Sequence, residues 1–145
     1  MSDRNSIMFN PWRYLADNHP DVEVVWTKLP RKMRGCTDGE TIWMDPRLTQ
    51  IQRRETVCHE TVHVERGTYP VCASEERTVN RISARRLIAI DDLVDALREG
   101  PQQSVSELAA MLWVEAKTLR LRLDSLDAFE LETVEALFDS DWNVA

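Results

Sequence analysis

Residues 59–63 read HETVH, and this is the segment whose residue types and spacing can do chemistry. Histidines four residues apart on a helix stand one above the other, with Cβ atoms about 5–6 Å apart, so two imidazoles can bind one ion. Glu60 lies roughly 100° around the helix from His59, where it can take a proton from a water molecule at the metal without ligating the metal. The motif predicts a zinc site with His59 and His63 as ligands and Glu60 as general base.

A third protein ligand is needed if one coordination position of the zinc is to remain open for water. Glu76 is the candidate, and Asn80 one turn later can hydrogen bond to the free ring nitrogen of a ligating histidine. Glu75 is the alternative ligand, but Asn80 shares a helix face with Glu76, whereas Val79 follows Glu75. Tyr69 can donate a hydrogen bond to an oxyanion, although an ordinary aromatic resting on the sheet is the favoured interpretation there.

The alternative to a metal site is a solvated helix face with two histidines. The chain has three histidines in all, so their spacing, the helical context and the downstream glutamate together favour a metal. A catalytic centre is favoured over a structural one because closed structural zinc sites usually contain several cysteines. Cys58 is expected to be a buried packing thiol beside Val62. Manganese or iron in place of zinc stays open.

The elements that position these residues begin with a small sheet. Pro11 opens an expected helix over 11–17, and the β-branched segment 21–27 predicts a strand. A turn signal at 37–40 separates residues 33–36 from residues 41–44, which predicts a β-hairpin. The first third of the chain is therefore expected to contain about three strands, in an antiparallel or mixed sheet.

The apolar period then changes to three and four residues, at Leu48, Ile51, Glu55, Cys58 and Val62. This pattern predicts an amphipathic helix ending near Gly67. A loop is expected over 68–73, and Ser74 is expected to cap the helix that carries the third ligand.

Further helices are expected after Gly100 and Pro101. Ser104 with Glu107 forms one capping box, and Asp127 with Glu130 resembles another. Between the boxes, residues 108–112 and 119–126 predict two helices around a turn near 113–114, and the acidic tail 139–145 is expected to fray.

Length and the expected elements indicate one folded α+β domain over 1–145: a core at 1–100, which its HExxH helix makes zincin-like, a helical extension at 101–138 and a tail at 139–145. The 145 residues are 43% hydrophobic and 30% charged, typical of a folded chain. Residues 1–10 hold no apolar signal-peptide core, and no long apolar run predicts a membrane span. Three cysteines at no framework spacing predict reduced thiols and a cytoplasmic protein.

A formal net charge of −7 argues against a simple nucleic-acid binder, which needs a basic face. The pairs Arg53-Arg54 and Arg85-Arg86 are interpreted as solvated helix faces. The C-terminal helices carry Lys117, Arg120 and Arg122 near a helix-turn-helix-like turn. A helical cap packed on the core is favoured over a DNA-binding unit.

From about residue 20 to 126 the chain resembles the ImmA/IrrE family of metallopeptidases, common near repressors in phages and other mobile elements. The similarity is most specific in the two expected metal-binding helices. It is carried by 41–44 (TIWM), 53–57 (RRETV), 59–63 (HETVH), Glu76, Val79, Asn80, Ile82, Ser83, Ala84, Leu87 and Ile88. Val62, Ser83 and Ala89 depart from the family's usual Gly, Ala and Pro.

The resemblance implies a zinc endopeptidase with Zn²⁺ on His59, His63 and Glu76, Glu60 as the catalytic residue and Asn80 as support. It also implies a protein substrate, such as a transcriptional repressor cut at a defined site. Two rivals stay open: a zinc-stabilised protein that binds a repressor without cutting it, and a DNA-binding regulator. The oligomeric state is open too.

Overall fold

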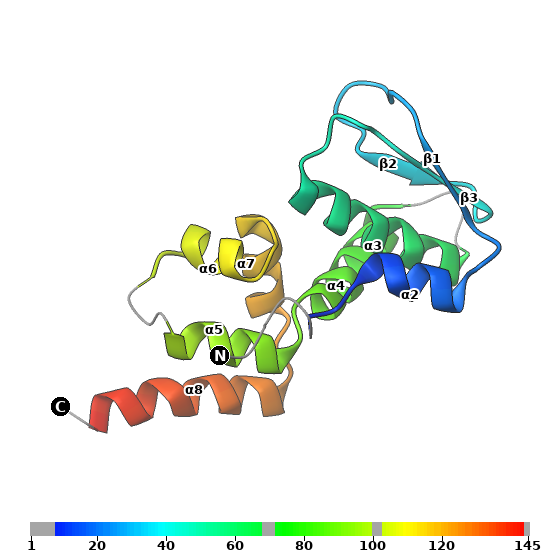
Figure 1. Cartoon of the computed structure of the whole chain (residues 1–145). Helices are drawn as coiled ribbons and strands as arrows, with labels where there is room; N and C mark the ends of the chain where they lie inside the picture. The colour runs from blue at the N-terminus through cyan, green and yellow to red at the C-terminus, as the bar shows by residue number, and fades with distance from the viewer. Residues whose placement is uncertain (1–7, 68–71, 100–102, 144–145) are drawn as a thin grey trace.

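The computed structural model describes residues 8–67, 72–99 and 103–143, in which a three-stranded sheet and seven helices form an α+β fold (Figure 1). In chain order the elements are α2 (Pro11–Asn18), β1 (Glu23–Trp26), β2 (Gly35–Thr37), β3 (Thr41–Met44), α3 (Gln50–Arg66), α4 (Ala73–Leu87), α5 (Ile90–Glu99), α6 (Val105–Met111), α7 (Ala116–Asp124) and α8 (Ala128–Asn143). The predicted α+β class, with a small sheet of about three strands, is confirmed.

The sheet is mixed, with β3 at its centre. β1 pairs with β3 in parallel, β2 pairs with β3 antiparallel, and the strand order is β1-β3-β2. The β2–β3 hairpin turns at Gly39, where φ is +96°, a left-handed conformation that glycine adopts without a steric penalty. The predicted hairpin is confirmed, and it leaves β2 at the edge of the sheet.

Helix α3 begins and ends through local signals. Thr49 caps its start in a capping box with Gln52, and Gly67 ends it with φ of +60°. Cys58 is 2% exposed and Val62 is 1% exposed. The structure thus agrees with the predicted helix end near Gly67 and with the prediction that Cys58 is a buried packing thiol.

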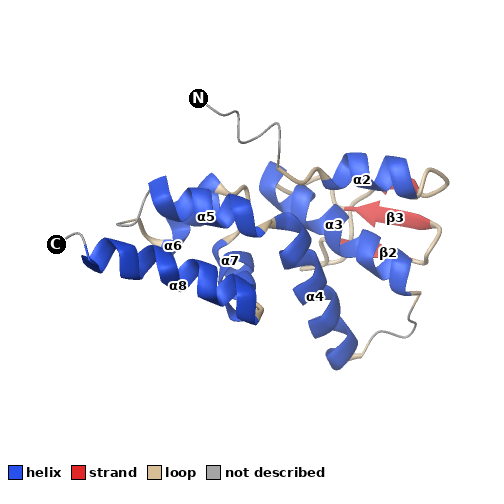
Figure 2. Ribbon diagram, turned by 90° about the horizontal axis from the view of Figure 1, so that it is seen from below, coloured by secondary structure: helices blue, strands red, loops and turns tan. Residues whose placement is uncertain are grey.

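Two apolar clusters include residues of α3, one on the side of the sheet and one on the side of the C-terminal helices. One joins α2, the sheet and α3 through Leu15, Ile42, Met44 and Val57. The larger cluster gathers Cys58 of α3, the end of α4 and the helices that follow. Figures 1 and 2 show the sheet and α2 on one side of the molecule and α5–α8 on the other. Helix α3 is therefore held by packing from both sides.

The start of α4 differs from the prediction. The helix begins at Ala73 with Cys72 as N-cap, and Ser74 lies in its first turn. The first helical hydrogen bond runs from the Glu76 N–H to the Cys72 carbonyl at 2.9 Å, while the Ser74 hydroxyl lies 3.1 Å from the Cys72 sulfur. Ser74 as a cap is therefore wrong. Residues 68–71 of the expected loop lie outside the described part of the chain.

Helix α5 is an element that the sequence analysis does not predict. Ile88 leaves the helical conformation with φ −126° and ψ 90°, which ends α4 and lets α5 start at Ile90. The Ile88 side chain is fully buried, and its carbonyl accepts a 2.7 Å hydrogen bond from Arg122 Nε. A partner 34 residues away thus fixes this break.

The C-terminal helices follow their caps. Both capping boxes form, with Glu107 N–H on Ser104 at 3.2 Å and Glu130 N–H on Asp127 at 2.8 Å. Helices α6 and α7 occupy the expected regions with shifted ends, and Trp113 between them has φ of +58°. Helix α8 runs to Asn143 and so extends into the segment 139–145 that is expected to fray.

Candidate metal centre

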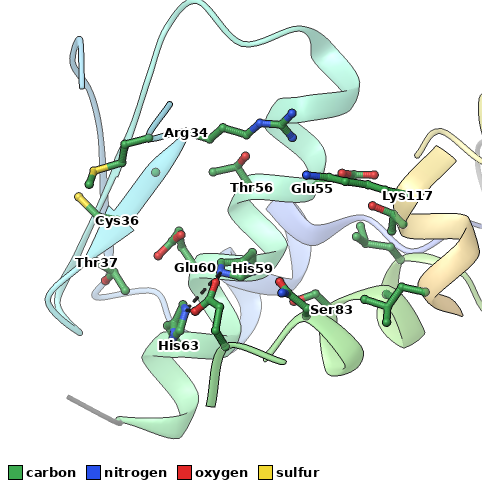
Figure 3. Close-up of a pocket in the computed structure, with 18 of the residues that line it drawn as sticks. Arg34, Cys36, Thr37, Glu55, Thr56, His59, Glu60, His63, Ser83 and Lys117 are labelled. Atoms are coloured by element: carbon green, nitrogen blue, oxygen red, sulfur yellow. Dashed lines mark hydrogen bonds and ion pairs between the residues drawn. The ribbon is translucent and has the colours of Figure 1, made fainter. Parts of the chain in front are cut away.

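His59 and His63, on consecutive turns of α3, meet Glu76 from the first turn of α4. His59 Nε2 lies 2.7 Å from Glu76 Oε1 and 3.2 Å from His63 Nε2, and His63 Nε2 lies 3.1 Å from Glu76 Oε2. The three ligand atoms lie within 4.8 Å of one another, the one such group found in residues 8–67, 72–99 and 103–143. Figure 3 shows the two imidazoles pointing into the same cavity.

The donor set fits zinc. Two nitrogens that are each about 2.0–2.1 Å from a tetrahedral zinc are about 3.3 Å apart, close to the 3.2 Å between the two imidazole nitrogens. The 2.7 Å between His59 and Glu76 is the distance of a direct hydrogen bond, so this pair would have to open slightly around an ion. Two imidazoles and one carboxylate leave a fourth tetrahedral position open.

The structure distinguishes the two neighbouring glutamates. Glu75 binds Arg66 at the end of α3, with Glu75 oxygens 2.5 Å from Nε and 3.0 Å from one terminal nitrogen. Glu76 faces the histidines. Glu76, and not Glu75, is therefore on the side of α4 that faces the histidines, as helix geometry predicts. The metal-binding role of Glu76 stays a prediction.

The surroundings of the two imidazoles differ. Asn80 lines the same cavity as His59, and its side chain acts to raise the pKa of that imidazole. Its supporting role stays a prediction. His63 Nδ1 is buried with no hydrogen-bond partner in the described part of the chain. His63 is therefore held through its Nε2 contact with Glu76 and by packing around the opposite edge of its ring. Tyr69, the candidate oxyanion donor, lies outside the described residues.

Burial sets the protonation of the central groups. It lowers the pKa of His59 and thereby favours the neutral imidazole, the form that binds metals. Burial, together with the Glu76 carboxylate, raises the pKa of Glu60 to about 8. Glu60 thus keeps its proton at neutral pH until a positive charge nearby favours its carboxylate.

The group lies in a cavity of about 930 Å³ bounded by β2, α3, α4 and α7. Figure 3 shows Cys36 and Thr37 of β2 on one side of Glu60, with Lys117 of α7 on the opposite side of the cavity. Lys117, Thr118 and Leu121 line the cavity, so the C-terminal helices contribute one of its walls. This wall has no counterpart in the sequence predictions, because no local signal places α7 beside α3.

Gly35 is another residue that the sequence analysis misses. A Cβ at this position would lie 2.6 Å from Thr56 Cγ2 and 3.4 Å from Glu60 Cγ. The backbone of β2 therefore comes so close to α3 that only glycine fits. A glycine inside a predicted strand segment, here residues 33–36, is the available signal for such an approach.

The C-terminal part is tied to α3 and to the segment before β2 by ionic contacts. The Glu115 N–H donates to Glu55 Oε2 at 2.7 Å, and Arg34 donates twice to the Glu115 carboxylate, at 2.6 and 3.1 Å. The Arg34 hydrogen bonds lower the pKa of Glu115 to about 2, whereas burial raises the pKa of Glu55. These contacts fix the entry of α7 beside the cavity.

Arg122, one of the basic residues near the helix-turn-helix-like turn, is 1% exposed. Its terminal nitrogens donate to the two Glu130 oxygens at 3.1 and 2.7 Å. The buried Arg122 side chain therefore stabilises the fold and does not reach a phosphate on the surface.

None of the helices in residues 8–67, 72–99 and 103–143 is both long and apolar enough to cross a bilayer.

No protein-family model, curated protein or solved structure matches this chain.

Proposed function

We propose that this chain is a zinc-dependent endopeptidase that cuts a protein regulator, such as a transcriptional repressor, at a defined site. The observation that carries the proposal is the convergence of His59, His63 and Glu76 ligand atoms within 4.8 Å of one another. Glu60 lines the same cavity, which is large enough for a peptide segment. The HETVH motif and the resemblance to ImmA/IrrE metallopeptidases, with their zincin-like core, support the same reading.

His59, His63 and Glu76 would hold the ion. A zinc ion bound there would supply an acidified water and a Lewis acid for the scissile carbonyl. Glu60 accepts a proton in this scheme and returns it to the leaving amine. Asn80, one turn after Glu76 on the same helix, supports the His59 ring in this scheme. The cavity walls keep the peptide segment beside Glu60.

The metal site is tested by measuring the zinc content of purified protein by mass spectrometry. We expect about one zinc per chain, with loss in His63→Ala and Glu76→Gln. Glu75→Gln is the matched control, because Glu75 is adjacent in sequence but binds Arg66. No zinc in the wild type after zinc is supplied, or equal loss in both glutamine variants, would contradict the assigned ligands.

The catalytic role is tested with Glu60→Gln, which keeps the size of the side chain but removes its basicity. We expect zinc content to be unchanged and cleavage of a quenched peptide pool to fall by at least about a hundredfold, the usual contribution of a general base. Unchanged cleavage with unchanged zinc would refute the role of Glu60. Loss of cleavage in Glu75→Gln would indicate that the site is disturbed in another way.

A further inference from the structure

Three exposed cations lie around the opening of the cavity, on a chain whose formal net charge is −7. Arg31 and Lys32 come from the loop between β1 and β2, and Lys117 comes from α7. Within the part of the chain that the structure describes, none of the three forms an ion pair. We call these three residues the basic rim.

The other charges of the cavity do not cancel this rim. Arg34 is neutralised by its two hydrogen bonds to Glu115. The carboxylates of Glu55 and Glu60 lie deeper in the cavity, at 8% and 6% exposed, and Glu76 faces the histidines. The opening of the cavity is therefore positive, while the protein as a whole is negative.

The backbone at Lys32 gives a second, independent observation. The Met33 N–H donates to the Pro30 carbonyl at 3.0 Å, which closes a four-residue turn with Lys32 in its third position. Lys32 has φ of +72° there, a conformation for which glycine is the preferred residue. Non-glycine residues in such strained conformations concentrate at functional sites. A lysine at this position brings a charge to the opening at a conformational cost.

We propose that the basic rim selects substrates with an acidic segment next to the bond that is cut; this inference rests on the proposed function. Aspartate or glutamate side chains of the substrate would lie between the loop that carries Lys32 and helix α7. Leu121, which lines the same cavity and is only partly buried, provides apolar surface for a neighbouring substrate side chain. A peptide fits better than a nucleic acid, because three cations on an acidic protein neutralise few phosphates.

Long-range attraction between exposed charges is screened by salt. Each contact between a cation of the basic rim and a substrate carboxylate therefore raises kcat/KM a few-fold at low ionic strength. Together the three contacts give about a tenfold preference in kcat/KM for acidic peptides over neutral ones. The preference falls towards unity as salt is added. Basic peptides are disfavoured by a similar factor.

The test uses the zinc-loaded full chain and three quenched peptide pools that share a randomised centre. Their flanks are aspartate and glutamate, asparagine and glutamine, or lysine and arginine. We expect the acidic pool to be cut fastest at about 0.05 M salt and the preference to shrink at about 0.5 M salt. Lys32→Gly with Lys117→Gln should remove most of it, and Lys32→Gly also relieves the strained turn, so unfolding does not explain the loss.

Arg120→Gln is the matched control, because Arg120 is exposed on the same helix as Lys117 but does not line the cavity. It should keep the preference. Equal cleavage of all pools, or an equal loss in Arg120→Gln, would overturn the proposal. So would a single-stranded oligonucleotide of equal charge that binds more tightly than the acidic peptides.

Binding of the same pools to Glu60→Gln, followed by fluorescence anisotropy, separates this proposal from the proposed function. Acidic peptides that bind preferentially without any cleavage by the wild type would support the basic rim and refute the peptidase. Cleavage without an acidic preference, in rate or in binding, would refute the basic rim and leave the peptidase standing.

Discussion

Replacing Gly35 by alanine should separate β2 from the helix that carries His59 and His63. The new Cβ would lie 2.6 Å from Thr56 Cγ2 and 3.1 Å from the Trp43 carbonyl oxygen. An ordinary contact between carbon atoms is about 3.5–4.0 Å, so α3 and β2 must part by about 1 Å. Thr56 is buried and β-branched, and it cannot swing away freely. Overpacking of this kind costs about 1–3 kcal/mol in the free energy of unfolding.

The assay is urea unfolding followed by circular dichroism, together with the peptide cleavage rate. Thr56→Ser removes the clashing methyl group, so the double variant should recover about 1 kcal/mol relative to the sum of the single changes. Gly39→Ala is the matched control: nothing lies within 4 Å of its Cβ, and only its φ of +96° is strained. It should cost about 1 kcal/mol without changing cleavage.

Full stability of Gly35→Ala would refute the close approach of β2 to α3. Additive effects in the double variant would show that Thr56 is not the residue that blocks the new methyl group. A loss of cleavage in Gly39→Ala equal to that in Gly35→Ala would show that stability, rather than the position of Glu60, limits the rate.

Three further predictions concern the core, the thiols and the metal. Arg122→Ala removes two hydrogen bonds to Glu130 and leaves the two from Arg85, so it should cost about 1–3 kcal/mol in chemical denaturation. Because the Arg122 hydrogen bonds hold the pKa of Glu130 at about 2, below its unfolded value of about 4.3, this stabilisation is complete above about pH 4.3 and is lost as the pH falls towards 2. The double variant Arg122→Met, Glu130→Gln lacks this pair, so the difference between its free energy of unfolding and that of the wild type should change over this pH range. A difference that stays constant would contradict the assignment. Burial raises the pKa of Cys58 to about 12, so iodoacetamide should label the exposed Cys72 first, and Cys58 only after unfolding, as read by mass spectrometry. Zinc at about a hundred times its Kd should raise the free energy of unfolding of the wild type by about 2.7 kcal/mol, and that of His63→Ala much less.

Signals that act over a few residues were readable from the sequence. The four-residue spacing of His59 and His63 needs only a helix to bring the imidazoles together, and the structure has them 3.2 Å apart. The Gly67 helix end, the β2–β3 hairpin and both C-terminal capping boxes are likewise set by contacts between near neighbours. Ser74 is the local exception, because the helix starts at Ala73, two residues earlier than a Ser74 cap would start it, and the Ser74 hydroxyl faces Cys72.

Contacts between distant residues needed the tertiary structure. The parallel pairing of β1 with β3, the break at Ile88 and the wall that α7 gives to the cavity have no signal in their own segments. Gly35 and Lys32 became informative only when their neighbours and backbone angles were known. Glu76 reaches His63 across 13 residues only because α3 and α4 pack side by side. The sequence thus determined which groups can do the chemistry, whereas packing between distant segments decided where they meet, because burial and close approach belong to no single segment.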